Sequence, residues 1–257
     1  MSERFEVMPF ARAVEEAGQL PEPVRLTVTC SPKHGLDHSI EVGTELRSLG
    51  HAVTIHFAAR MVRSRDHLDE ALGAMADAGI DDAFVVGGDS PEPLGPYASA
   101  VEIVPRVAEH PRRPATIGIA GYPEGHPLID DAALVDALAA KAPYADYLTT
   151  QLCFDPEAIL RFARGVDLPV LAGVPGLVDP ARLLEISLRV GVGPSLRYLR
   201  KQRGLRNLIK LSSSSAERLS DALAGRDELA GFHYYTFNRL LDTWSWTRAT
   251  TTKEVMT

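Results

Sequence analysis

The chain has 257 residues, of which 45% are hydrophobic and 24% are charged, a balance typical of a globular protein and a length that suits one α/β barrel. A net charge of −7 argues against a nucleic-acid or anionic-membrane partner, because such binding depends on basic patches. Two cysteines are too few for a disulfide framework, the first ten residues lack an apolar signal core and no apolar run is long enough to span a bilayer, so we expect a cytoplasmic protein.

Short β-rich runs alternate with amphipathic stretches along the chain. Glycine and proline separate them: Pro23 and Pro32 enclose the second run, and Gly87 and Gly88 follow the fourth. We predict strands over 4–8, 24–30, 52–57, 82–86, 115–120, 147–151, 169–173 and 231–236. We predict helices over 37–49, 64–78, 97–108, 130–141, 155–164 and 179–190, and from Asn238 onward.

Extra helical material lies between the seventh and eighth predicted strands, near 194–203 and 214–223. Ser214 and Glu217 form an S-x-x-E pattern that is typical of a helix start. The stretch 197–206 holds five basic residues. It is interpreted either as a solvated helix face or as a rim that attracts anions.

Eight β-then-α units predict parallel strands joined by crossover helices. Runs such as AFVV and LPVLAGV are almost continuously apolar, as strands buried on both faces are. Eight such units close most naturally into a (β/α)8 TIM barrel, with a doubly wound open sheet as the alternative. No linker or shift in composition indicates a second domain, so we expect residues 1–257 to form one barrel.

Polar residues follow most of the predicted strands. The carboxyl ends of the strands form the active-site face of such a barrel, so we expect these side chains to meet at one mouth. They are Glu6, Thr29, His56, Asp89 (directly after Gly88), Tyr122, Glu124, His126, Gln151, Asn238 and Arg239.

Glu6 lies between two apolar residues inside the first strand. A buried carboxyl has a raised pKa and can serve as a general acid, whereas an edge residue would simply face water. Asp89 follows two glycines, which fits either close approach to a ligand or an ordinary turn. The loop at 117–127 could pack Tyr122 against a planar ligand, although a histidine such as His126 is more often structural. Glu124 and His126 lack further ligands nearby, so we expect no metal site.

Motifs throughout the chain resemble those of the methylenetetrahydrofolate reductase family. Each resemblance is short, but the motifs occur in the family's order and at the expected strand ends. The segments are FEVMPF at 5–10, TVTCSP at 27–32, IHFAAR at 55–60, VGGDSPEP at 86–93, AGYPEGHP at 120–127, LTTQLCFD at 148–155, GVPGLVDP at 173–180 and FHYYTFNR at 232–239.

This resemblance implies an oxidoreductase in which NAD(P)H reduces bound FAD and a one-carbon tetrahydrofolate then takes the hydride. By the same resemblance, Glu6 would protonate the folate nitrogen, and Asp89 would lie by the flavin and the pterin and tune both. Gln151 would bind the pterin and Arg239 the folate. The flavin would be lined by Thr29, His56, Gly88, Asp89, Tyr97, Ala98, Tyr122, His126 and Lys141.

The chain also departs from the family pattern. Gly87 stands where the family's R-G-D segment has arginine, and the segment between His126 and Lys141 is one residue short. One alternative is therefore a flavin-free reductase with direct hydride transfer from nicotinamide. Others are a folate-binding methyl or methylene transferase without redox activity, and a non-catalytic folate or flavin carrier. The choice of NADH or NADPH, the physiological direction and assembly into a homo-oligomer stay open.

Overall fold

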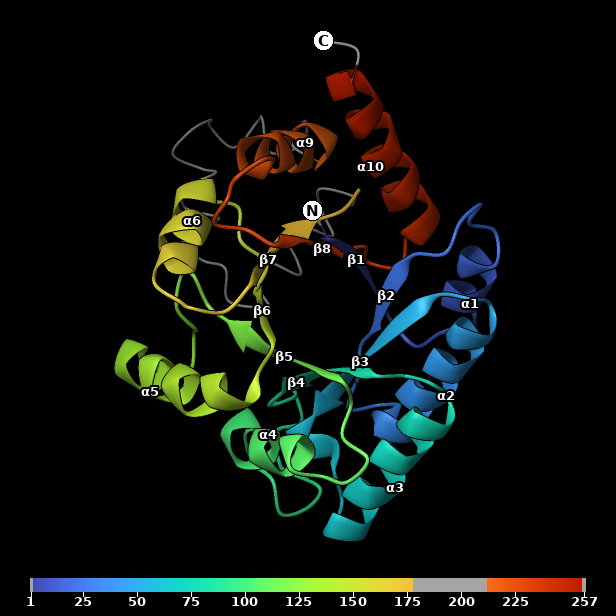
Figure 1. Ribbon diagram of the computed structural model, residues 1–257, viewed down its shortest axis with the longest axis vertical. Coiled ribbons are helices and arrows are strands. Elements are labelled where there is room, and N and C mark those ends of the chain that lie inside the picture. Colours follow the sequence, from blue (N-terminus) through green and yellow to red (C-terminus); the bar gives the residue numbers. More distant parts are fainter. Residues whose placement is uncertain (1, 178–211, 256–257) are drawn as a thin grey trace.

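A closed barrel of eight parallel strands forms the centre of the computed structural model, which describes residues 2–177 and 212–255. Each strand pairs with its neighbour in chain order, and β8 returns to pair with β1 (Figure 1). This confirms the predicted (β/α)8 architecture over the open sheet. The strands are β1 (Ser2–Val7), β2 (Arg25–Val28), β3 (Ala52–Ala58), β4 (Asp82–Val86), β5 (Thr116–Gly121), β6 (Tyr147–Thr150), β7 (Val170–Pro175) and β8 (Gly231–Tyr235).

Helices surround the barrel on its outside (Figure 1). Local sequence explains several of their starts: Ser64 caps α3 by accepting from the amide of His67, and Asp130 caps α5 by accepting from the amide of Ala133. The helices are α1 (Ala11–Ala17), α2 (Gly35–Ser48), η1 (Ala59–Met61), α3 (Arg65–Asp77), α4 (Ala100–Ala108), α5 (Asp131–Lys141), η2 (Ala142–Tyr144), α6 (Pro156–Arg164), α9 (Ser212–Leu223) and α10 (Leu240–Val255).

The predicted strands are all present, with ends that differ by at most two residues. The helices differ more. α1 was not predicted, since its seven residues are too few to show a periodic pattern. α4 begins at Ala100, so Tyr97 lies in the loop before it, and α9 begins two residues before Ser214. The segments at 179–190, 194–203 and 197–206 lie outside the described residues.

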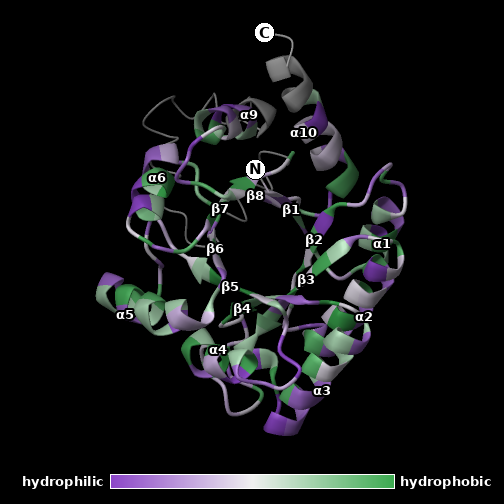
Figure 2. Cartoon of the chain, viewed as in Figure 1, coloured by the Kyte–Doolittle hydropathy of each residue, from purple (hydrophilic) through white to green (hydrophobic). Residues whose placement is uncertain are grey.

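Side chains alternate along each strand between the outer core and the barrel interior. On β1, Phe5 and Val7 are buried under the helices, whereas Arg4 and Glu6 point into the barrel. Helices α2 and α3 carry hydrophobic and hydrophilic residues on different sides, as expected for helices that cover a sheet (Figure 2). No helix among residues 2–177 and 212–255 is long and apolar enough to cross a membrane.

A buried polar layer crosses the lower part of the barrel interior. Arg4 Nη1 donates to Asp82 Oδ2 at 2.6 Å and to Thr54 Oγ1 at 2.9 Å. The Tyr147 hydroxyl donates to Asp82 Oδ1 at 3.0 Å, and its ring lies 4.1 Å below the Arg4 guanidinium. Gly118 leaves room for that ring, because a Cβ there would lie 2.2 Å from Tyr147. The layer fixes β1, β3, β4 and β6, which carry the next layer of side chains.

Candidate active site

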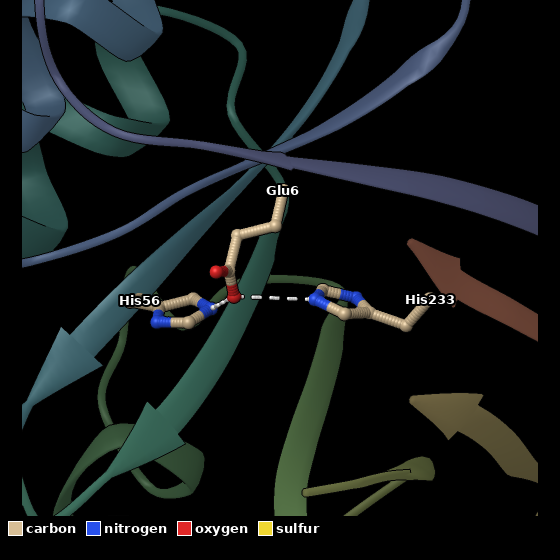
Figure 3. Close-up of side chains that lie close together, drawn as sticks. All are labelled: Glu6, His56 and His233. Carbon is tan, nitrogen blue, oxygen red and sulfur yellow. Dashed lines mark hydrogen bonds and ion pairs between the residues drawn. The ribbon is translucent and has the colours of Figure 1, made fainter. Parts of the chain in front are cut away.

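Two residues further along the same strands, a second layer of side chains meets inside the barrel. Glu6 projects from β1, His56 from β3 and Phe84 from β4, while His233 projects from β8. Glu6 Oε2 lies 3.3 Å from His233 Nε2 and 3.5 Å from His56 Nε2 (Figure 3). Phe84 packs against the His56 ring, with 4.9 Å between the ring centroids. The structure therefore places the Glu6 carboxyl between two imidazoles inside the barrel.

Burial governs the charge of these groups. The side chains of Glu6, His56 and His233 are 18%, 14% and 2% exposed. Burial lowers the pKa of His56 to about 4; the Glu6 carboxylate opposes this shift, and His233 adds to it. His56 is therefore neutral near pH 7, with one ring nitrogen protonated.

Several polar atoms around this layer make no hydrogen bond within the described part of the chain. They are Thr27 Oγ1, Thr29 Oγ1, His56 Nε2 and His233 Nδ1. Buried polar atoms are nearly always hydrogen-bonded in folded proteins, so such a group is where a polar ligand would make its contacts. Thr27 on β2 is the register neighbour of Glu6, and Thr29 directly follows β2. His56 on β3 and His233 on β8 contact the Glu6 carboxyl through their Nε2 atoms.

The ends of β4, β5 and β8 also converge. The charge of exposed Asp89 adds to burial in raising the pKa of Tyr122, and it opposes the effect of burial on the pKa of His126. The Tyr122 and His126 rings meet edge to face at 5.1 Å. Tyr235, whose hydroxyl donates to the Thr150 carbonyl at 3.0 Å, has a pKa well above its usual value because of burial and then of Glu6 and Tyr122. Among the predicted strand-end residues, Asp89 thus acts electrostatically on Tyr122 and His126.

The two expected folate-binding residues are less buried. Gln151 is half-buried, and its side-chain oxygen accepts from the amide of Leu152 at 2.8 Å. Arg239 is exposed and pairs with Asp242 at 2.8 Å in the first turn of α10. The chain turns sharply just before it, because Phe237 and Asn238 both have positive φ values, 51° and 62°. Such backbone is costly for residues other than glycine and often occurs at functional sites.

The expected flavin-binding residues come from the ends of β2 to β5 and from the loops and the helix that follow them, and we call this set of residues the cradle. Gly88 has φ of 91°, and a Cβ there would lie 3.0 Å from Ala58 Cβ, so glycine is needed. Tyr97 is buried, and Lys141 is a buried cation whose Nζ donates to the Ala120 carbonyl at 3.4 Å. Burial lowers the pKa of Lys141. An orphaned Thr29 hydroxyl, a buried cation and a close-packed glycine fit the chemistry of a phosphate-bearing planar cofactor.

Arg60 orders the loop between β4 and α4. Its Nε donates to the Ala98 carbonyl at 2.8 Å, and its Nη1 donates to the Ser90 carbonyl at 2.9 Å. These bonds hold the backbone of the segment that carries Asp89 and Ala98. Sequence reasoning gave Arg60 no such role.

Sequence reasoning also missed His233. The signal was present, since His233 alternates on β8 between Phe232 and Tyr234 as Glu6 alternates on β1. Glu6, His56 and His233 form a group of three close donors of the kinds that can bind metal, whereas the sequence drew attention to Glu124 and His126. We interpret the contact between Glu6 Oε2 and His233 Nε2, at 3.3 Å, as a long hydrogen bond that joins an imidazole nitrogen to a carboxyl oxygen.

The chain is similar to proteins of a known family. A family model described as methylenetetrahydrofolate reductase matches residues 11–180 of the chain. The chain belongs to the methylenetetrahydrofolate reductase family. The resemblance drawn from the motifs is thus confirmed at the level of the family. Glu6, His233 and Arg239 lie outside the matched residues, so this match does not bear on their roles.

Curated members of the methylenetetrahydrofolate reductase family are distant and longer. The chain is 24% identical over 210 residues to methylenetetrahydrofolate reductase 2 of Schizosaccharomyces pombe, covering 66% of this chain and 31% of that protein. It is 27% identical over 135 residues to methylenetetrahydrofolate reductase (NADH) 1 of Arabidopsis thaliana, covering 42% of this chain and 22% of that protein. The chain therefore spans less than a third of the length of either relative.

Solved structures share the fold of this family member. The glycerol uptake operon antiterminator regulatory protein from Listeria monocytogenes matches with a TM-score of 0.50 and 11% identity, covering 91% of each chain. At such low identity the match concerns the barrel alone.

Proposed function

We propose that this chain reduces 5,10-methylenetetrahydrofolate to 5-methyltetrahydrofolate with electrons from NAD(P)H. Membership of the methylenetetrahydrofolate reductase family supports the substrate and the reaction class, and one curated relative carries NADH in its name. The observation that carries the proposal is the Glu6 carboxyl, held inside the barrel between two imidazoles. An acid at that place is what opening of the methylene bridge requires.

Glu6 is the general acid of this proposal. It gives a proton to the folate nitrogen that leaves the methylene bridge; that C–N bond breaks, and the one-carbon unit becomes an iminium ion. Hydride addition to this carbon then gives the methyl group. The carboxyl is well placed for such work because it is largely shielded from water yet partly exposed at the mouth.

In this proposal, residues at the ends of the strands orient the substrate. Gln151 offers an amide to the pterin, and the exposed Arg239 lies at the end of β8, where the glutamate tail of a folate would extend. Asp89 keeps a negative charge close to Tyr122 at the same mouth. Because Arg239 pairs with Asp242, the proposal requires it to exchange that partner for the folate carboxylate.

FAD is the proposed hydride carrier, and the chain's residues fit it. Thr29 and His56 would face the cofactor from β2 and β3, and Lys141 would supply positive charge for the phosphates. The remaining positions of the cradle are Gly88, Asp89, Tyr97, Ala98, Tyr122 and His126. When bound, the flavin supplies hydride transfer, while the protein orients the reactants and handles the proton.

Direct hydride transfer from nicotinamide to folate is the second candidate. One observation favours it: Gly87 offers no side chain where the family motif has arginine, so a phosphate contact is missing. Arg60 does not replace it, because its guanidinium is bound to the Ala98 and Ser90 carbonyls. The two candidates share Glu6 as the acid and differ in the cofactor.

Two measurements on the purified protein test the proposal. Nicotinamide oxidation that depends on methylenetetrahydrofolate is expected, and its absence would leave a non-redox transferase or a carrier as the function. The absorption spectrum separates the two reductases: a flavin band near 450 nm with about one flavin per chain supports FAD, and full activity in protein without that band supports direct transfer.

A further inference from the structure

The oxygen that faces both imidazoles belongs to the proposed acid. Glu6 Oε2 accepts from His233 Nε2 at 3.3 Å, and His56 Nε2 lies 3.5 Å from the same atom (Figure 3). The rings come from opposite sides of the carboxyl, His56 on β3 and His233 on β8 (Figure 3). Two imidazoles on one oxygen suggest a division of roles.

The two rings differ in what surrounds them. His233 is almost fully buried, and its Nδ1 makes no hydrogen bond within the part of the chain that the structure describes. An N–H at its Nε2 therefore points at the Glu6 carboxyl. His56 faces the same oxygen but stays neutral near pH 7, because burial lowers its pKa to about 4. It can donate or accept a hydrogen bond, yet it holds no spare proton.

An ordinary glutamate side chain loses its proton near pH 4.3, whereas an imidazole does so near about 6.5. A carboxyl that must donate a proton at neutral pH therefore benefits from an imidazole bonded to the same oxygen. The exposed fraction of Glu6 is larger than that of His233, so water reaches the pair through the carboxyl.

We propose that His233 is a positioning residue that holds the Glu6 carboxyl and stores the proton that Glu6 delivers to the folate. This rests on the proposed reductase function. In each turnover the Nε2–H bond of the imidazolium breaks as an O–H bond forms on Glu6 Oε2. That O–H bond breaks as the N–H bond forms on the folate, leaving a neutral imidazole and a carboxylate. A proton from water resets the pair through Glu6 after the product leaves.

Other charged groups near His233 do not provide this proton. On its own strand the Tyr235 ring meets it edge to face at 5.0 Å, and the pKa of that phenol is well above its usual value. From β1, Glu6 is its hydrogen-bond partner, and Arg4 is its register neighbour. Arg4 is engaged by Asp82 in the layer below.

The test replaces each imidazole by glutamine. The amide nitrogen of glutamine can take the place of Nε2 and donate to Oε2, but it does not titrate. In His233→Gln we expect kcat/KM for methylenetetrahydrofolate to fall about tenfold or more at pH 7, with tetrahydrofolate affinity within about twofold of wild type. In the plot of kcat/KM against pH, the alkaline limb, on which the rate falls as the pH rises, should shift by at least about one unit to lower pH.

His56→Gln is the matched control, on the same oxygen. We expect it to lower the rate by the same factor at every pH and to leave that limb in place. An unmoved limb in His233→Gln, or an equal movement in His56→Gln, would overturn the proposal. So would about one equivalent of bound transition metal that both variants lose, because the three side chains would then be metal ligands.

If a variant fails to fold, nitrogen NMR of the imidazoles in the wild-type protein tests the proposal instead. We expect the Nε2 signal of His233, and not that of His56, to change over the pH range in which the enzyme loses activity. An invariant neutral His233 over that range would contradict the proposal. Wild-type protein that shows no folate-dependent nicotinamide oxidation would instead reject the reductase function, so the two failures are distinguishable.

Discussion

Replacing Arg4 by methionine tests the polar layer that supports the site. The substitution keeps the length of the side chain but leaves Asp82 as an unpaired carboxylate inside the barrel. Loss of one partner of a buried ion pair costs about 3–5 kcal/mol. Thr54 and Tyr147 still donate to Asp82, at 3.0 Å each, so the lower end of that range, about 3 kcal/mol, is expected.

Urea unfolding at pH 7, followed by circular dichroism, measures this free energy. The control is the double variant Arg4→Met with Asp82→Asn, in which no charge is left unpaired. It should recover at least about 1.5 kcal/mol relative to the sum of the two single variants, since the partners are in direct contact. A loss below about 1 kcal/mol in Arg4→Met, or strict additivity in the double variant, would refute the argument.

Two further predictions concern stability. The buried His56 has a pKa of about 4 in the folded chain, whereas a histidine in the unfolded chain gains its proton near pH 6.5. The free energy of unfolding therefore falls by about 3 kcal/mol between pH 7 and pH 4. Urea unfolding of His56→Gln should lack this part of the pH dependence. Gly118→Ala places a Cβ 2.2 Å from the Tyr147 ring and should cost about 1–3 kcal/mol in the same assay. Gly87→Ala, which meets nothing within 4 Å, should cost nothing; equal losses in the two alanine variants would contradict the packing argument.

The strands could be predicted closely because apolar runs bounded by glycine and proline are a local signal. The same alternation left two positions open for Glu6, one buried and one facing water, and the structure places it inside the barrel. Its partners could not be predicted, because closure of β8 against β1 brings together residues 227 positions apart. A contact between residues so far apart in the sequence forms only when the barrel closes, so local sequence patterns do not predict it.

Helix ends and loop residues were harder to predict for a different reason. α1 is short, and tertiary contacts define it: the Glu16 carboxylate accepts from the amide of Leu240 at the start of α10. Tyr97 was expected on a helix but lies in the preceding loop, which Arg60 ties down through backbone carbonyls. Neither interaction leaves a periodic trace in the sequence.

The central claim is that the Glu6 carboxyl gives a proton to the folate. Its most direct test is the rate of methylenetetrahydrofolate-dependent nicotinamide oxidation by Glu6→Gln, with tetrahydrofolate binding measured in parallel. Glutamine keeps the size and hydrogen bonding of the side chain but cannot act as the acid, so the rate should fall at least about 100-fold while affinity stays within about twofold. A variant that keeps the wild-type rate would contradict the claim.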